Sequence, residues 1–216
     1  FLVLIFAAAG FQMNMPQFFG DILRRWGMYG ILSLAMVPAV QCGIGLNFGI
    51  SMGIVGGLLG GIIVIQLNIA QIPALVAVHP MFASWVAVMA AILIGVVLAT
   101  GIGYLYGLLL NRVKGSEMTV TTYVGFSIIA FMNMVWMLLP FDNGELIWPN
   151  AGKGMRNTIS LASSYSEVMN NTLAVEIGSF VLPTGLLLFF FLMCFLVWLF
   201  MRSRTGMAMT AAGANP

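Results

Sequence analysis

The stretch that decides the fold is PAVQCGIGLNFGISMGIVGGLLGGIIVIQLN, residues 38–68. It is apolar enough for a lipid bilayer, but Pro38, Gln41 and Asn47 interrupt its first third. Glycines are denser than an ordinary lipid-facing helix needs, at positions 43, 45, 49, 53, 56, 57, 60 and 61. The stretch therefore predicts a membrane helix that is broken near its start and closely packed after the break.

Each part of this pattern has a physical consequence. Irregular backbone at membrane depth persists only where protein or a water-filled cavity covers its polar groups, so residues 38–47 are expected inside a helix bundle. Glycines 49, 53, 57 and 61, with 56 and 60 beside them, have the small-xxx-small spacing that lets helices approach to backbone contact. The alternative interpretation is that the glycines serve packing only and that Gln41 and Asn47 form hydrogen bonds between helices.

The composition is that of an integral membrane protein. Hydrophobic residues make up 61% of the 216 residues, charged residues only 6%, and the mean hydropathy is +1.05. These values predict a multi-pass protein of the cell membrane, in contact with lipid, and exclude a soluble globular domain. The net charge of +2 provides no basic face, so nucleic acid is not an expected partner.

The apolar runs predict a single all-α domain over residues 1–216, a polytopic membrane helix bundle with a Gly-rich broken helix. The expected spans are residues 1–12 (partial), 26–40, 48–67, 81–110, 118–139 and 181–201. Residues 12–25 are predicted to be a polar connection and residues 142–177 a long polar loop, with an amphipathic helix over 161–177. Because the run at 1–12 is shorter than the roughly 20 residues of a span, the chain is expected to lack its first half-span.

The sequence shows no pattern of catalytic or metal-binding residues, so an enzyme is not predicted. The acidic residues all fall in connections or at span ends: Asp21, Glu117, Asp142, Glu145, Glu167 and Glu176. A proton- or sodium-coupled carrier usually needs an acid at membrane depth, so this distribution argues against that mechanism. The polar residues within the spans are uncharged: Gln41, Asn47, Ser51, Thr100, Thr121, Thr122, Ser127 and Asn133. They suit either a route for a neutral hydroxylated solute or hydrogen bonds between helices.

The tail MRSRTGMAMTAAGANP, residues 201–216, resembles a cytoplasmic motif of the permease subunits of binding-protein-dependent ABC importers. That family moves simple sugars, nucleosides and branched-chain amino acids. In it a span ends in a basic residue, followed by Thr and Gly, a small-residue stretch with Ala, and Gly-x-Asn. The matching positions here are Arg204, Thr205, Gly206, Ala212, Gly213 and Asn215.

Other segments are similar to the same family in the same order. Residues 20–51 look like its second span and the Gly-Ile-Asp-Leu-Ser-x-Gly turn that follows, although Gly45 and Asn47 stand in place of the aspartate and the serine. Residues 104–126 are similar to its fourth span, link and fifth span, and residues 182–185 to the entry of the sixth. Members of the family continue with further helices, so the chain is expected to lack C-terminal helices.

The resemblance implies a transport subunit without cofactors of its own. Its expected partners are an ABC ATPase subunit that binds ATP and Mg²⁺, a second permease subunit, identical or related, and an extracellular or periplasmic solute-binding protein. Residues 202–216 are then expected to be a cytoplasmic coupling segment that enters a groove of the ATPase, and the loop at 142–177 to be extracellular. A bulky residue at Gly213 is expected to uncouple ATP hydrolysis from uptake.

The expected solute path runs through the bundle interior beside Gln41, Gly45, Asn47 and Asn133. A simple sugar or a nucleoside is favoured as the solute. One alternative is a secondary carrier or channel in which the broken helix forms a site at the bilayer midplane. Another is an assembly subunit whose glycines serve helix association alone.

Overall fold

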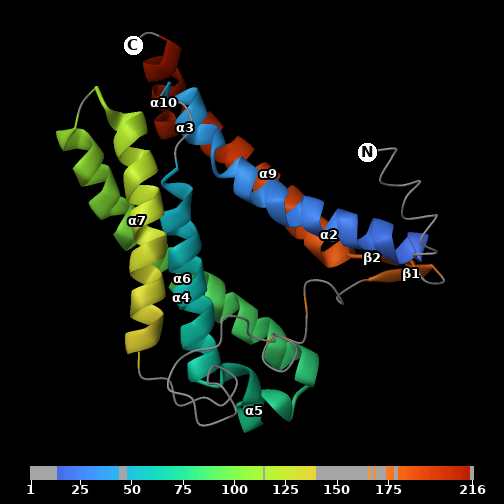
Figure 1. The fold of residues 1–216 in the computed structure, drawn as a ribbon. Coiled ribbons are helices and arrows are strands. Elements are labelled where there is room, and N and C mark those ends of the chain that lie inside the picture. The colour runs from blue at the N-terminus through green and yellow to red at the C-terminus, as the bar shows by residue number, and fades with distance from the viewer. Residues whose placement is uncertain are drawn as a thin grey trace. The chain divides into compact units, whose positions relative to one another are not determined.

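A computed structural model describes residues 14–43, 48–113, 115–139, 165, 168, 174–177 and 180–214 of the chain. The chain divides into two compact units. The first unit contains residues 1–38 and 167–215, and the second contains residues 39–166. In Figure 1 the helices of the first unit are drawn in blue and in orange to red, and those of the second in cyan to yellow.

The first unit is built on two long helices that lie side by side (Figure 1). They are α2 (Met15–Leu34) and α9 (Thr184–Arg202). A short antiparallel hairpin, β1 (Val175–Ile177) and β2 (Phe180–Leu182), precedes α9 and packs through β2 on α2. The last helix, α10 (Arg204–Ala214), packs against α9.

Glycines of α2 set its distance from the elements beside it. A Cβ atom added at Gly20 would lie 2.9 Å from the carbonyl oxygen of Val181, and one at Gly30 would lie 2.6 Å from the ring of Phe190. Gly27, between them, is buried. From Gly20 to Gly30 along α2, the residue in contact changes from Val181 to Phe190. Because the residue numbers rise in both segments, α2 and α9 run parallel.

The second unit packs α4 (Ile50–Gln66) against both α6 (Pro80–Arg112) and α7 (Glu117–Leu138). Two short elements, η1 (Ile69–Gln71) and α5 (Pro73–Val76), make the turn from α4 to α6. Much of the buried apolar core comes from α4: Met52, Val55, Ile62, Val64 and Ile65. α4 is therefore the element that holds this unit together.

Local chemistry fixes the ends of these helices. α4 is followed by Asn68, whose φ of 50° is the left-handed conformation that asparagine tolerates better than most residues. α6 starts at Pro80, whose fixed φ suits a first helical position. The Nδ1 atom of His79 accepts a hydrogen bond from the Met81 backbone N–H at 3.2 Å. His79 is thus the cap of α6.

α4 and α6 cross at small residues on both helices. Gly56 faces Ala99, and Gly60 faces Ala91 and Gly95, so the two helices run antiparallel. A Cβ at Gly60 would lie 2.5 Å from the backbone nitrogen of Gly95 and 2.7 Å from the carbonyl oxygen of Ala91. At these distances the backbones are in direct contact, as small-xxx-small stripes allow.

Not all of the predicted glycines take part in this crossing. A Cβ added at Gly53 would meet no atom of another element within 4 Å, and one at Gly61 would meet only a loop tyrosine, at 3.7 Å. Of the predicted glycines, Gly56 and Gly60 therefore make the contact, and the Cα of Gly57 lies beside them, 3.2 Å from a Cβ added at Gly95. The two glycine stripes of α4 have the same spacing, and the surface of α6 decides which of them faces inward.

Four described helical segments are long and apolar enough to cross a membrane: Ile50–Gln71, Met81–Arg112, Met118–Trp136 and Thr184–Arg202. They confirm the predicted all-α polytopic membrane bundle. The 33 residues of α6 make it about 50 Å long at 1.5 Å per residue. This exceeds the roughly 30 Å of a hydrocarbon core, so α6 must tilt or project.

The helix break agrees with the sequence prediction in part, at the turn of residues 42–43, but a first break already occurs at residues 35–36. α2 ends at Leu34, and the short α3 (Val37–Gln41) follows after one turn. A turn follows α3, in which Gly43 has a φ of 79°, a conformation that costs glycine little. The next helix, α4, begins at Ile50. Of the predicted broken segment, residues 44–47 lie outside the described residues.

The polar connection predicted for residues 12–25 is wrong, because α2 already begins at Met15. Pro16 favours a helix start there, since its missing N–H is not needed in the first turn. The expected span at 26–40 is divided between α2 and α3, and α2 is not among the four candidate spans. Its charges, which include an ion pair of Asp21 with Arg24 at 3.7 Å, lower its mean hydropathy.

The long loop also differs from the prediction where it is described. Residues 175–177 form strand β1 instead of the end of an amphipathic helix, and the last helix begins at Thr184 instead of residue 181 because β2 precedes it. The backbone pairing of the hairpin takes precedence over the helical spacing of the apolar side chains. Most of residues 142–177, and the predicted partial span at 1–12, lie outside the described residues.

Replacing Gly60 with alanine is expected to force α4 and α6 apart, because the new methyl group would collide with backbone atoms of α6. Overpacking of this kind costs about 1–3 kcal/mol, which corresponds to a fall of about 2–12 °C in the midpoint of thermal unfolding in detergent. The matched control is Gly53→Ala, at a helical glycine with open space. Equal losses in the two variants would contradict the assigned crossing.

Candidate translocation path and coupling helix

Of the four predicted path residues, the structure describes two, which lie on different helices. Gln41 is exposed at the end of α3, and Asn133 is exposed on α7. Gly45 and Asn47 lie outside the described residues. Asn133 follows Gly125, which meets the start of α4, by about 12 Å along the α7 axis at 1.5 Å per residue. It therefore lies at a different depth in the bundle from the helix break.

Hydroxyl groups within the helices mostly bind backbone carbonyls. The hydroxyls of Thr100, Thr121 and Thr122 donate to carbonyl oxygens three or four residues earlier, at 2.7 to 2.9 Å. Ser51 donates to Phe48 at 2.9 Å and also reaches the Gly125 carbonyl of α7 at 3.3 Å. These contacts support the packing interpretation for this subset of the polar residues.

The described spans have charge-free interiors. In the four candidate spans charged residues occur only at Arg112 and Arg202, the last residue of each of two spans. Within the part of the chain that the structure describes, no group of three or more His, Cys, Asp or Glu side chains is placed to hold a metal ion. The interiors of these four described spans therefore contain no charged side chain.

Tyr165 connects the long loop to α4. Its hydroxyl donates a hydrogen bond to the Gly61 carbonyl oxygen at 2.7 Å. Its ring packs, together with Trp136 of α7, on the buried pair Ile62 and Ile65. Burial raises the pKa of Tyr165 to about 12, so the hydroxyl keeps its proton at physiological pH. This residue fixes one point of the loop on the second unit.

The predicted coupling residues lie on α10, which directly follows α9. Arg204, Thr205 and Ala212 are exposed, Gly206 is buried and Gly213 is half-buried. Asn215 lies outside the described residues. The five described positions therefore have different surroundings, and three of them are exposed to a partner.

Ser203 is the single residue between α9 and α10. Its own N–H donates to the Phe200 carbonyl at 2.9 Å and its backbone is extended, with φ −69° and ψ 165°. Its carbonyl accepts from the Met207 N–H at 2.9 Å, and its Oγ accepts from the Gly206 N–H at 3.3 Å. Ser203 thus ends one helix and caps the next.

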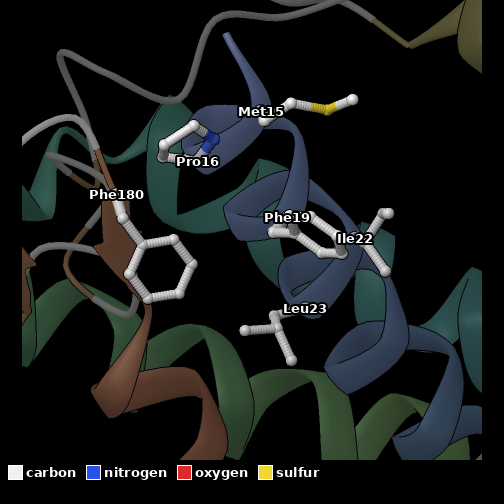
Figure 2. Close-up of a pocket in the computed structure, with 6 residues that line it drawn as sticks. All are labelled: Met15, Pro16, Phe19, Ile22, Leu23 and Phe180. Carbon is white, nitrogen blue, oxygen red and sulfur yellow. The ribbon is translucent and has the colours of Figure 1, made fainter. Parts of the chain in front are cut away.

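An open apolar hollow of about 620 Å³ lies in the first unit, between the start of α2 and β2 (Figure 2). The residues that line it are Met15, Pro16, Phe19, Ile22, Leu23 and Phe180. Phe180 faces it from β2, opposite the side chains of α2. Since none of these side chains is polar, the hollow offers no partner to a polar solute and is not a part of the candidate path.

The four apolar helices define a multi-pass integral membrane protein. The chain belongs to the family described as branched-chain amino acid transport system / permease component, which it matches over residues 18–216. This confirms the predicted permease of ABC importer type. Permeases of this type are transport subunits that work with an ATPase and a solute-binding protein. No curated protein and no solved structure matches the chain.

Two features of the structure were not predicted from the sequence. Ala91, Gly95 and Ala99 of α6 have the same four-residue spacing as the glycines of α4 and could have been recognised as the partner stripe. Ser203, three residues before Gly206, has the spacing of an N-cap to the N3 position. The predicted coupling residues begin at Arg204, so Ser203 was not among them.

Replacing Tyr165 with phenylalanine is expected to remove its hydrogen bond while keeping the ring contacts. The cost is about 0.5–1.5 kcal/mol, measured as a lower midpoint of thermal unfolding in detergent. Tyr123→Phe, at a highly exposed position of α7, is the control and should leave the midpoint unchanged. A loss in the control as large as in Tyr165→Phe would contradict this role.

The ionisation of Tyr165 gives an independent test. The difference in tyrosinate absorbance between wild type and Tyr165→Phe should have its midpoint near pH 12. Because the folded state disfavours the phenolate, the stabilising contribution is complete below pH about 10 and is lost as the pH rises to about 12. A difference signal centred near pH 10 would show that Tyr165 is not buried against α4.

Proposed function

We propose that this chain is a permease subunit of an ATP-driven importer and forms part of its translocation pathway. The family match over residues 18–216 carries the proposal, because it includes both the helix break and the tail. The charge-free span interiors and the short helix after the last span are consistent with it. ATP and Mg²⁺ would bind to the partner ATPase, and this chain would carry no cofactor.

The proposed contact with the ATPase is the exposed surface of α10. Thr205 and Ala212 are exposed there, together with Ala208 and Ala211. Small side chains allow a short helix to approach the walls of a groove closely, as they do between helices in a bilayer. Arg204 precedes them with a positive charge at the membrane boundary. The coupling role of Asn215 rests on the family motif alone.

The remaining proposed partners are a solute-binding protein and a second permease subunit. With α10 in the cytoplasm, the loop at 142–177 faces outward and receives the solute-binding protein. A second permease subunit, identical or related, completes the pathway. Gln41, Gly45, Asn47 and Asn133 are proposed to line it. The binding of ATP by the partner would shift the permease between inward-open and outward-open packings, through a difference in affinity for the two states.

The proposed solute is a small neutral molecule with hydroxyl groups, of the simple sugar or nucleoside class. The charge-free interiors of the described spans support this choice. An amino acid carries an ammonium and a carboxylate group, and burying both is costly unless the protein provides partners for them. The class in the family description, a branched-chain amino acid, is the competing outcome of the uptake test.

The function is tested by reconstituting the chain in vesicles with its ATPase and binding protein. Uptake of a labelled sugar or nucleoside should require ATP inside the vesicle, on the side of α10. Uptake that needs no ATP and follows a proton or sodium gradient would identify a secondary carrier instead. Uptake of branched-chain amino acids alone would keep the importer and change the solute.

Replacing Ala212 with tryptophan is expected to uncouple the ATPase, because the bulky ring would prevent a close approach of α10. Gly213 is half-buried, so Ala212 tests the exposed surface without disturbing the packing of α10 itself. ATP-driven uptake and ATPase stimulation by the loaded binding protein should both fall about tenfold or more, within the usual range of coupling energies. Leu93→Trp, on an exposed surface of α6, is the control. Wild-type rates in Ala212→Trp would contradict the assigned coupling surface.

A further inference from the structure

The joint between α9 and α10 is unusually short. A single residue, Ser203, separates the two helices, and its extended backbone turns the chain. Its hydrogen bonds reach the last turn of α9 and the first turn of α10. A joint of one residue with bonds to both helices has few free dihedral angles, so the direction of α10 is set by that of α9.

Gly206, in the first turn of α10, packs against the end of α9. A Cβ added at Gly206 would lie 2.5 Å from the Cα and 2.7 Å from the carbonyl oxygen of Met201, and closer still to the carbonyl oxygen of Phe200. All three are backbone atoms, so no rotation of a flexible side chain could relieve the collision. The first turn of α10 therefore rests directly on the last turn of α9, and only glycine permits this contact.

The last turns of α9, which lead into the joint, are held by contacts between side chains. The Arg202 guanidinium lies 4.2 Å from the centre of the Trp198 ring, which stacks on Phe195 one turn earlier. Further along, α9 packs on α2 at Gly30, where the Phe190 ring leaves no space for a side chain. α10, α9 and α2 thus belong to one compact unit with close contacts along its length.

We infer that Gly206 and Ser203 are positioning residues that fix α10 to α9, so that a displacement of α10 moves α9 and α2 with it. The inference rests on the proposed function, in which the ATPase displaces α10. It assigns to Gly206 a role different from that of its exposed neighbours: it holds the angle between the two helices and does not contact the partner. Its buried position on α10 is the basis for this distinction.

The geometry is tested on the permease alone. Nitroxide labels are placed on cysteines at Leu192 and Ala214, both exposed, after Cys42 and Cys194 have been replaced by alanine. Wild type should give one narrow distance distribution by pulsed electron spin resonance. Gly206→Ala should shift and broaden it, and the matched control Gly103→Ala, at a helical glycine with open space, should not. An unchanged distribution in Gly206→Ala would overturn the inference.

The coupling role is tested in the reconstituted complex. Gly206→Ala should still co-purify with the ATPase and keep its basal hydrolysis within about twofold, while stimulation by the loaded binding protein and uptake fall about tenfold. Ser203→Ala, which loses only the capping oxygen, should show the same split to a smaller degree, and Ser203→Thr should restore stimulation. Full stimulation in a Gly206→Ala protein with an altered distance distribution would overturn the coupling role.

The two proposals fail in distinguishable ways. A wild-type chain that binds no ATPase would contradict the proposed function, and the distance measurement would still decide whether Gly206 fixes the joint. Loss of ATPase binding in Gly206→Ala alone would place Gly206 in the contact surface and overturn its assignment as a positioning residue.

Discussion

Direct backbone contact between helices is the constraint on which this structure depends. In a bilayer the lipid tails are as apolar as the side chains, so hydrophobic burial does little to bring helices together. Close approach at small residues provides the attraction instead, through dispersion contacts over a long stretch of backbone. Gly60 against Gly95 in one unit, and Gly206 against Phe200 and Met201 in the other, are the points where this contact is closest.

The same contact has a consequence for transport. Helices that touch through their backbones cannot slide past a neighbour without losing many contacts at once, so each pair tends to move as a body. In the first unit α10 rests in this way on α9, and glycines 27 and 30 of α2 pack against the side chains of Leu186 and Phe190 of α9. In the proposed function, a displacement of α10 would reach α9 and α2 without a flexible linker between the helices.

The family could be recognised from the sequence, and the contacts that hold the candidate site could not. The tail motif around Arg204 and Thr205 identified the family, and the break after Gln41 lies where proline and glycine predict it. The sequence did not reveal that Gly206 is buried against α9 or that Tyr165 binds α4, since both contacts join separate elements. It also predicted that Gln41 and Asn133 line one path, which stays a prediction; the structure places them on α3 and α7.

By itself the sequence determined that this protein is a bundle of membrane helices of the permease family. The reason is local: a segment that enters hydrocarbon must satisfy its own backbone hydrogen bonds, and apolar runs of sufficient length do so only as helices. Only the tertiary structure decided that Gly56 and Gly60 face α6 at the crossing while Gly53 does not. Two stripes of equal spacing lie on α4, and the rotation of a helix depends on the surface it meets, which its own sequence does not contain.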